Sequence, residues 1–461
     1  MSNPKTGWTC TELTSRISRR TWVRDREPGW ARRTRPRSNC ALAVHGQAWI
    51  QYSARRPRRS SVQAIIEMTT RPKNALIMQS GGCTNVLNSS LFGIVSEAAD
   101  AGAFGRVHGA SHGLEGLLEG KTVDLTDVPQ ATWRRIARSP GAALGSTRRK
   151  LTPDDVPIVL DRLAALSIGY WFIIGGNDSA ETGHTLSVEA TKAGYDLTVV
   201  NVPKTIDNDL VMTDHCPGYG SAARFVALAA MGAGADAEAM GAASPITIQE
   251  VMGRDTGWLA AAAALGRREE RDAPHVICLP ETPVDEDRFV AQIEAAYTRF
   301  GFAVAVVSEN ARSANGVLGG QCEPWFVDDF GHPYYDGPAH YLSGLVSKRL
   351  SVRTRYEKPG TIQRSFVAAA SRRDLTEAEM AGRAAVRAAM NGHTDVIVTL
   401  ERAPGSAYEC ITGLAPLDAV GGKVRTMPSE FLDAAAGELK PAFLRYLRPL
   451  VGRLPRFARL G

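Results

Sequence analysis

The sequence is poor in cysteine and has no long apolar run. Its seven cysteines are scattered over 461 residues and never form a C-x-x-C pair, so neither a disulfide framework nor a thiolate zinc site is indicated. The longest apolar candidate, residues 258–265, is mostly alanine and is far shorter than the roughly 18 residues of a membrane helix. These absences predict a cytoplasmic protein with reduced thiols and no membrane segment.

Two nucleotide-binding signatures are also missing at the first glycine turn. Ser80-Gly81-Gly82 does not match G-x-x-x-x-G-K-[ST], and it lacks the third glycine of a dinucleotide-binding turn. The turn therefore carries no recognised nucleotide-binding motif.

Charge of both signs is present, but it is unevenly placed. The chain is 22% charged and 44% hydrophobic, a globular composition whose length allows two or three domains. Residues 1–73 hold sixteen Lys or Arg against four acidic residues, a local net charge of +12, whereas the whole chain carries +6. Residues 74–461 are therefore acidic, with a net charge of −6, and the basic character belongs to a leader.

Several interpretations of this leader, residues 1–73, are open. Its Arg-rich, acid-poor runs, such as residues 55–60, are typical of a nucleic-acid arm or an organelle transit peptide. It also holds four of the chain's eight tryptophans without helical or alternating spacing. The alternatives are a disordered tail or a segment that is not native, with translation starting at Met68.

From residue 74, short β-branched or apolar runs alternate with Ala-rich amphipathic stretches. This alternation predicts βαβ units and mostly parallel sheets covered on both faces, an α/β fold. We expect strands at 75–78, 170–174, 197–202, 246–251, 275–279 and 303–307. We expect helices at 86–98, 180–193, 219–240, 256–266, 285–300, 338–350 and 376–391.

Polar, glycine-rich and charged residues gather at the carboxyl ends of these strands. In open α/β sheets, ligands bind at that edge. Because five strands deliver the same kind of chemistry, we expect one converging site.

Two glycine pairs, Gly81-Gly82 and Gly175-Gly176, each lie between an expected strand and an expected helix. Such a turn brings backbone N–H groups and a helix N-terminus to an anion. Many strand-to-helix turns need glycine for steric reasons alone, so both interpretations of the first pair are open.

A pair of aspartates follows the strand expected at 197–202. Asp207 and Asp209 lie two residues apart, with Lys204 and Thr205 beside them. Crowded like charges are costly without a cation, and Mg²⁺ would relieve this repulsion while bridging phosphate oxygens. The other interpretation is an exposed acidic turn in which one Asp caps a helix.

Five motifs, in order and approximate spacing, resemble the phosphofructokinase family from about residue 74 to the C-terminus. They are Gly175-Gly176-Asn177-Asp178, Pro203-Lys204-Thr205-Ile206-Asp207-Asn208-Asp209, Met252-Gly253-Arg254, Pro280-Glu281 and Gly360-Thr361-Ile362-Gln363-Arg364. The resemblance implies two Rossmann-like, doubly wound domains. Residues 74–218 with about 363–461 would bind the phosphoryl donor and Mg²⁺, and residues 219–362 would bind the sugar phosphate.

The resemblance also implies residue roles in phosphorylation of fructose 6-phosphate at its 1-hydroxyl. Asp207 matches the general base, and Asp209 and Asn177 match the Mg²⁺ ligands. The implied catalytic set is Asp207, Asp209, Lys204 and Arg254. The implied sugar-phosphate set is Thr205, Ile206, Asp207, Met252, Gly253, Arg254, Glu281, Arg355, Thr361, Gln363 and Arg364. The positions implied beside the donor are Gly81, Gly82, Arg148, Asp178 and Lys204.

The donor is indicated by two of these residues. ATP-using members of the family commonly have Gly where this chain has Asp178, which leaves room for the nucleotide's α-phosphate. Members that use pyrophosphate have Asp there and Lys at the place of Lys204, so the resemblance favours pyrophosphate. Residues 213–220 also look like a bacterial pyrophosphate-using subgroup.

Three departures from the family pattern affect the expected site. Asn177 replaces the usual Asp, which removes one charge from the metal site. Pro245 stands where ATP-using bacterial members have an Arg that reaches a neighbouring subunit's sugar phosphate, so that contact is in doubt. Thr361 replaces a His common in that branch.

We therefore expect a pyrophosphate-dependent, reversible, cytoplasmic 6-phosphofructokinase that is a homodimer or higher homo-oligomer. The alternative enzyme is the ATP-dependent form. A nucleic-acid-binding protein led by the basic arm is the hypothesis from another class, but it leaves the Asp pair, the Lys and the Arg set at the strand ends unexplained.

Overall fold

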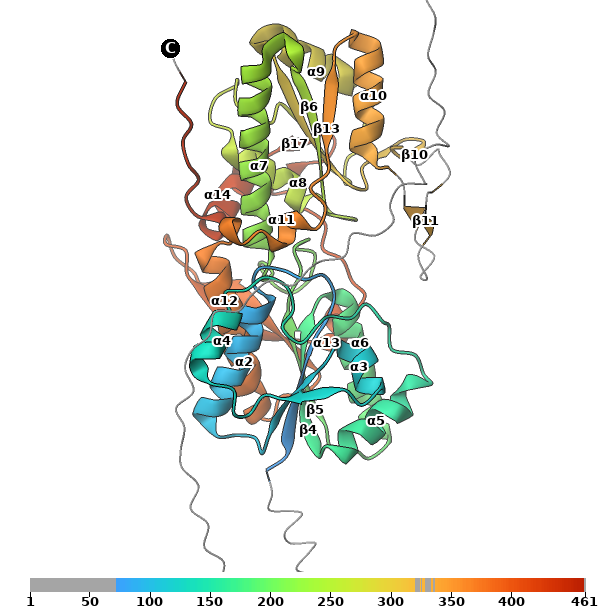
Figure 1. The fold of residues 1–461 in the computed structure, drawn as a ribbon, viewed down its shortest axis with the longest axis vertical. Coiled ribbons are helices and arrows are strands. Elements are labelled where there is room, and N and C mark those ends of the chain that lie inside the picture. The colour runs from blue at the N-terminus through green and yellow to red at the C-terminus, as the bar shows by residue number, and fades with distance from the viewer. Residues whose placement is uncertain (1–71, 320–323, 325, 328–332, 335, 460–461) are drawn as a thin grey trace, which may run out of the picture. The chain divides into compact units, whose positions relative to one another are not determined.

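A computed structural model describes residues 72–319, 324, 326–327, 333–334 and 336–459. All but the last two residues of the leader lie outside this range, so its proposed roles are not tested. The described chain folds around a seven-stranded and a four-stranded β-sheet (Figure 1). We call each sheet with its covering helices the first lobe and the second lobe, respectively.

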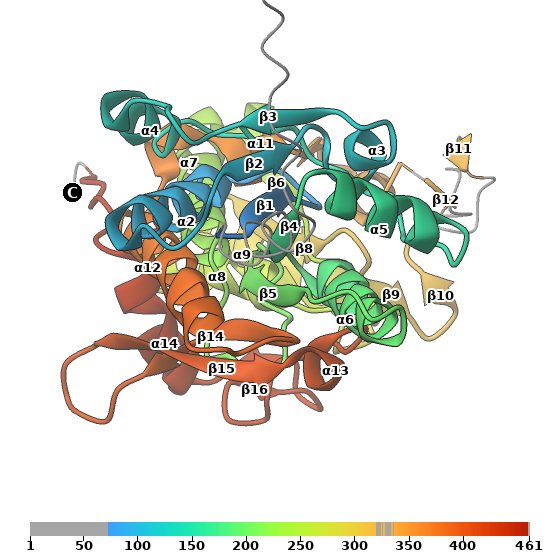
Figure 2. The same cartoon turned by 90° about the horizontal axis from the view of Figure 1, so that it is seen from below.

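The first-lobe sheet is mostly parallel and has the order β15-β14-β5-β4-β1-β2-β3 (Figure 2). Its neighbouring strands pair in parallel except at the two edges, where β2 with β3 and β14 with β15 are antiparallel. The strands are β1 (Asn74–Gln79), β2 (Val107–Ala110), β3 (Thr122–Asp124), β4 (Ile168–Gly175), β5 (Thr198–Pro203), β14 (Val396–Arg402) and β15 (Cys410–Pro416).

Helices cover both faces of this sheet, which is why its central strands are apolar in consecutive positions. Ala75 and Ile77 of β1 pack on the face shared with α2 (Leu87–Ala101), α4 (Gln130–Ile136) and α12 (Arg372–Met390). Leu76 and Met78 face the opposite side. The helices of that side are α3 (Gly113–Leu118), α5 (Asp155–Ala165), α6 (Asn177–Lys192) and α13 (Leu417–Val420).

The second-lobe sheet is parallel throughout and has the order β13-β6-β8-β7. Its strands are β6 (Ile246–Val251), β7 (Val276–Cys278), β8 (Ala303–Ser308) and β13 (Thr354–Glu357). One face packs against α9 (Glu286–Phe300) and α10 (Pro338–Leu350). The other packs against α7 (Tyr219–Met240) and α8 (Trp258–Ala262), which share a core with α14 (Pro441–Val451) (Figure 1).

A buried carboxylate joins the two lobes at the start of α7. Asp374 of α12 accepts hydrogen bonds from the backbone N–H groups of Gly218 and Ser221, both at 2.8 Å. These N–H groups lie in the first turn of a helix, where they have no partner within the helix. The first-lobe helix α12 therefore caps a second-lobe helix.

The remaining elements are short. The two-residue strands are β9 (Arg312–Ser313), β10 (Gly316–Val317), β11 (Phe326–Val327), β12 (Pro333–Tyr334), β16 (Leu432–Asp433) and β17 (Glu438–Leu439). The short helical pieces are α11 (Ile362–Ser365) and the 3₁₀ turns Gly241–Ala243, Ala263–Gly266 and Val367–Ala369. In the described part of the chain, no helix has the length and hydropathy of a membrane-spanning segment.

The expected α/β architecture with mostly parallel sheets is confirmed, and the six expected strands are all present. Helix starts were less accurate. The helix expected from 376 begins at Arg372, because Ser371 caps it by accepting a hydrogen bond from Asp374 N–H. The helix expected at 256–266 is instead α8 followed by the 3₁₀ turn Ala263–Gly266.

Two glycines allow α2 and α12 to approach closely. A Cβ atom at Gly93 would collide with the backbone carbonyl of Glu379, and one at Gly382 would collide with that of Ser90. Each glycine thus faces the other helix's backbone, and neither position has room for a side chain.

We predict that Gly382→Ala lowers the free energy of unfolding by about 1–3 kcal/mol, the usual cost of overpacking a core. Gly344→Ala is the matched control, since Gly344 lies within α10 with open space around its Cβ position, and it should stabilise by about 1 kcal/mol through helix propensity. Urea unfolding followed by circular dichroism measures both. Equal effects of the two substitutions would contradict the close packing.

Candidate active site

Both lobes send the carboxyl ends of their strands to one pocket of about 380 Å³. From the first lobe, the segments after β1, β4 and β5 line it, and from the second lobe, the segments after β6 and β8. The expectation of one converging site at the strand ends is therefore met by the geometry. The first three segments carry glycine turns and the Asp pair, and the last two carry Arg254 and Glu309.

The turn after β1 is glycine-rich because two cations occupy the space beside it. Lys204 Nζ donates to the Gly82 carbonyl at 3.2 Å, and a Cβ at Gly81 would lie 2.8 Å from the same Nζ atom. Gly81 also has a φ of 78°, which favours glycine. A Cβ at Gly82 would collide with the guanidinium of Arg364, so this turn needs glycine for a close approach.

Three positive side chains thus meet on one side of the pocket: Arg148, Lys204 and Arg364. Burial lowers the pKa of Lys204 to about 8, and the charges of Arg364 and Arg148 add to this effect. Burial and Arg148 likewise lower the pKa of Arg364. Because these cations repel one another, a bound phosphate-type anion would relieve strain as well as make hydrogen bonds.

Acidic side chains line the same pocket. Burial raises the pKa of Asp207 to about 7, and the nearby carboxylates of Asp209 and Glu309 add to this rise, while Arg254 and Lys204 oppose it. The Asp207 backbone is fixed by two hydroxyls, since its N–H donates to Thr205 Oγ1 and its carbonyl accepts from Thr256 Oγ1, both at 3.1 Å. A buried carboxyl that titrates near neutral pH is suited to accept a proton.

Asn177 and Asp209 have the oxygen atoms that a hard divalent cation prefers. Asn177 is the first residue of α6, and its Nδ2 donates to Asp209 Oδ2 at 3.0 Å. Its Oδ1 is buried and has no hydrogen-bond partner. Burial raises the pKa of Asp209, so a cation would stabilise its charged form. An unpartnered amide oxygen beside a buried carboxylate fits Mg²⁺.

Asp178 lies at the rim of this arrangement, in the first turn of α6. Its carboxylate is exposed and lies 3.6 Å from Lys150 Nζ, and both residues line the pocket. The carboxylate therefore lies at the solvent-exposed edge of the pocket rather than in the core.

The structure brings most of the expected site residues to the pocket. Those that line it are Gly81, Gly82, Arg148, Asn177, Asp178, Lys204, Thr205, Ile206, Asp207, Asp209, Met252, Arg254 and Arg364. Their roles rest on the resemblance and are taken up below as proposals.

Five expected residues do not line the pocket. Gly253 lies behind it with a φ of 124°, and a Cβ there would be 2.8 Å from the Thr256 carbonyl. Gln363 is buried, and its Oε1 accepts from Met252 N–H at 3.1 Å. Glu281 Oε1 accepts from the N–H groups of Gly257 and Met427. Gln363 and Glu281 thus hold the neighbouring backbone in place, and Gly253 supplies the backbone conformation there.

The other two, Arg355 and Thr361, belong to the segment from β13 to α11. Arg355 forms an ion pair with Asp236 of α7, and Thr361 is exposed at the start of α11. Neither faces the pocket within this chain.

Comparison with known proteins agrees with this geometry, since residues 74–403 match the family described as Phosphofructokinase. The chain belongs to the phosphofructokinase family.

Relatives in this family cover nearly the whole described chain. The pyrophosphate–fructose 6-phosphate 1-phosphotransferase of Rhodospirillum rubrum is 40% identical over 384 residues, which are 82% of this chain and 94% of that protein. The Xanthomonas campestris protein of the same name is 36% identical over 388 residues, with 82% and 91% covered. The crystal structure of a pyrophosphate-dependent phosphofructokinase from Nitrosospira multiformis matches with a TM-score of 0.75 and 32% identity, covering 84% of this chain and 94% of that one.

Glu309 is a pocket residue to which the sequence analysis gave no role. It directly follows β8, and its N–H donates to the Val251 carbonyl of the neighbouring β6 at 2.8 Å. Burial raises the pKa of its carboxyl, and Arg254 opposes the rise. Its position at a strand end was a usable signal, because the other pocket segments were found by that rule.

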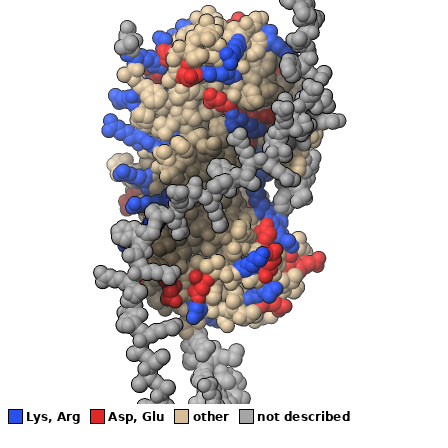
Figure 3. Space-filling view, in the orientation of Figure 1, with Lys and Arg blue, Asp and Glu red and all other residues tan. Residues whose placement is uncertain are grey.

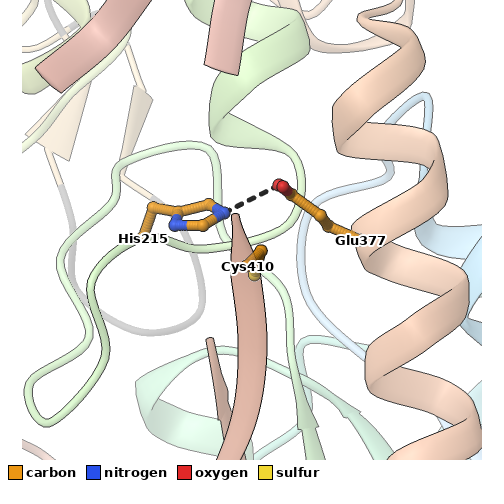
Figure 4. Close-up of side chains that lie close together, drawn as sticks. All are labelled: His215, Glu377 and Cys410. Atoms are coloured by element: carbon orange, nitrogen blue, oxygen red, sulfur yellow. Dashed lines mark hydrogen bonds and ion pairs between the residues drawn. The ribbon is translucent and has the colours of Figure 1, made fainter. Parts of the chain in front are cut away.

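A second buried polar cluster lies outside the pocket of this phosphofructokinase. His215 donates toward Asp214 Oδ2 at 2.9 Å and Glu377 Oε2 at 2.8 Å, and Cys410 lies beside them (Figure 4). Burial alone would lower the pKa of His215, but the hydrogen bonds to the two carboxylates raise it above its usual value. A doubly protonated His215 therefore explains the two hydrogen bonds, since each ring nitrogen donates to one carboxylate.

This cluster predicts a pH-dependent contribution to stability. The folded-state pKa of His215 lies above its unfolded value of about 6.5, so its stabilising effect is full below that pH and is lost as pH rises through the folded pKa. His215→Gln should therefore lower the free energy of unfolding relative to wild type. This decrease should be largest at pH 6 and should become smaller toward pH 9.

Chemical unfolding at a series of pH values measures this difference. His393→Gln, which removes an exposed histidine, is the control and should leave the unfolding curve unchanged. A loss for His215→Gln that grows steadily from pH 6 to pH 9 would contradict a protonated His215.

Proposed function

We propose that this chain transfers a phosphoryl group reversibly between pyrophosphate and the 1-hydroxyl of fructose 6-phosphate, giving fructose 1,6-bisphosphate and phosphate. The observation that carries the proposal is that Asp178 and the buried Lys204, whose Nζ donates to the Gly82 carbonyl of the glycine turn, line the same pocket. The names of the relatives from R. rubrum and X. campestris agree with it.

The donor is proposed to bind at the cation-rich side of the pocket. Arg148 and Lys204 would contact the pyrophosphate oxygens, and Gly81 and Gly82 leave the space that these contacts need. Asp178 stands where ATP-using relatives leave room for the α-phosphate, so its negative charge repels a nucleotide donor. Figure 3 shows charged side chains of both signs interspersed on this face of the molecule. We therefore assign anion binding to the cations of the pocket, Arg148 and Lys204, and not to the surface as a whole.

Asp207 is proposed as the general base. As the 1-hydroxyl oxygen attacks the donor phosphorus, the hydroxyl proton moves to the Asp207 carboxylate, and the bond from that phosphorus to the leaving phosphate breaks. A pKa raised to about 7 places this group near the pH at which a base is most useful. Lys204 would neutralise charge on the transferred or leaving phosphate, the main requirement of phosphoryl transfer.

Mg²⁺ is proposed to be held by Asp209 and Asn177, because the Asp209 carboxylate lies beside the buried, unpartnered amide oxygen of Asn177. A cation held there would supply positive charge that offsets the charge of the donor phosphates. The amide of Asn177 supplies a neutral ligand where the family pattern has a charged one.

The sugar phosphate is proposed to lie on the second-lobe side, so that the first lobe binds the donor and the second the acceptor. Met252 and Arg254 reach the pocket from the second lobe, Thr205 and Ile206 reach it from the segment after β5, and Arg364 reaches it from α11. Glu281 and Gln363 would act by holding the neighbouring backbone. The planar guanidinium groups suit two-point contacts with a phosphate.

A homo-oligomer is part of the proposal. Arg355 and Thr361 belong to the segment 355–366, which exposes apolar side chains at Tyr356, Ile362 and Phe366, the kind of surface that protein contacts cover. We also propose a cytoplasmic location, because the four cysteines in the described residues are free, as is usual in a reducing compartment.

The donor assignment predicts that Asp178→Gly begins to admit ATP, because it removes a side chain and a negative charge that exclude a nucleotide's α-phosphate, a repulsion worth about tenfold or more at close range. The same substitution should weaken the use of pyrophosphate. Initial rates with each donor at saturating fructose 6-phosphate measure both effects. Asp127→Gly, at an exposed turn away from the pocket, should change neither. Wild-type turnover with ATP but not with pyrophosphate would overturn the proposal.

The base assignment predicts that Asp207→Ser lowers kcat by about 10²–10⁴-fold with little change in the KM of fructose 6-phosphate, because the side chain acts in the transition state. Steady-state kinetics test it, with the exposed Asp161→Asn of α5 as control. Near-normal turnover of Asp207→Ser would remove Asp207 from this role.

A further inference from the structure

The segment between β5 and α7 carries both functional aspartates on an unusual backbone. Asn208 and Met212 have φ values of 56° and 63°, a conformation that side chains other than glycine rarely adopt. The carbonyl groups of Asn208, Thr213 and Asp214 converge on a single donor. We call residues 207–214 the aspartate turn. Such a backbone persists only when surrounding contacts hold it.

Arg425 provides those contacts from a distant part of the chain. Its Nη2 and Nε donate to the Asn208 carbonyl at 2.7 and 3.3 Å. Its Nη1 donates to the Asp214 carbonyl at 2.8 Å and also to that of Thr213. Its backbone N–H donates to the Asp209 carbonyl at 2.7 Å. One residue therefore binds carbonyls along the whole turn.

The same residue is held by the second lobe. The Trp258 indole N–H donates to the Arg425 carbonyl at 3.2 Å, and the Arg425 guanidinium lies 4.8 Å from the centre of a Trp258 ring. Two residues later, Met427 N–H donates to Glu281 Oε1. Because α8 begins at Trp258, the position of the aspartate turn is tied to the second lobe through Arg425.

We propose that Arg425 is a positioning residue for phosphoryl transfer, which fixes the aspartate turn so that Asp207 and Asp209 face the reacting groups. The proposal rests on the function proposed above. Arg425 does not line the pocket, so it acts on the reaction through the turn and not by touching substrate.

The planar fork of arginine is required for this role. A guanidinium has five N–H groups in fixed directions, whereas the ammonium of lysine is a single point charge. Lysine at this position reaches some of the three carbonyls and leaves the others without a donor, and a methionine leaves all three. The loss of activity should therefore be larger for Arg425→Met than for Arg425→Lys.

The test compares Arg425→Met and Arg425→Lys with wild type in steady-state kinetics with pyrophosphate and fructose 6-phosphate. We expect kcat to fall roughly 100-fold for Arg425→Met, as for a 1 Å misplacement of reacting groups, and less for Arg425→Lys. The KM of fructose 6-phosphate should change less than about threefold, on the reasoning that binding residues away from the turn are untouched. The Mg²⁺ concentration for half-maximal rate should rise, because Asp209 moves with the turn.

Lys423→Met is the matched control, since Lys423 lies two residues away, is exposed, and donates to the Asp418 carbonyl outside the pocket. It should retain wild-type kinetics. If Arg425→Met does not fold, Arg425→Lys carries the test, with its melting temperature measured beside its rates. Folded variants with wild-type kcat and Mg²⁺ dependence would overturn the proposal, whereas an inactive wild type would instead overturn the proposed function.

Discussion

Like charges crowd one another in the pocket, and this crowding is the constraint on which the site depends. Arg148, Lys204 and Arg364 lie near one another beside the glycine turn, and the carboxyl groups of Asp207, Asp209 and Glu309 lie near one another in the same pocket. The rise in the pKa of Asp207 and the fall in that of Lys204 follow from the same burial and repulsion. A phosphate-type anion beside the cations and a divalent cation beside the carboxylates would offset these two repulsions.

The fold supports this crowding from outside the pocket. Buried polar contacts at the lobe junction hold the backbone that carries the charges: Asp374 caps α7, Gln363 holds Met252, and Arg425 holds the aspartate turn. Each contact is made between segments far apart in the sequence. These backbone contacts, rather than contacts among the charged side chains, therefore fix much of the geometry of the pocket.

Much of this architecture was predictable from the sequence, and the remainder was hidden for identifiable reasons. Short apolar runs that end in glycine or acidic residues located β1, β4, β5, β6 and β8 and the pocket beside them. The same rule pointed at Glu309. It gave no information about Arg425, because an arginine in an irregular segment has no periodicity, and its function depends on carbonyl groups more than 200 positions away. Glu281 Oε1 accepts from the Gly257 and Met427 N–H groups, a partnership that no local pattern reveals, while its Oε2 is buried without a hydrogen-bond partner.

The position of Arg425 in the chain has a consequence for how the protein can be divided. The family match ends at residue 403, before β15, the edge strand paired along the full length of β14, and before α14, which packs in the core around α7. A fragment cut at that boundary would keep all the charged residues of the pocket, yet it would lose the residue that closes the aspartate turn. The catalytic unit is therefore longer than the stretch by which the family is identified.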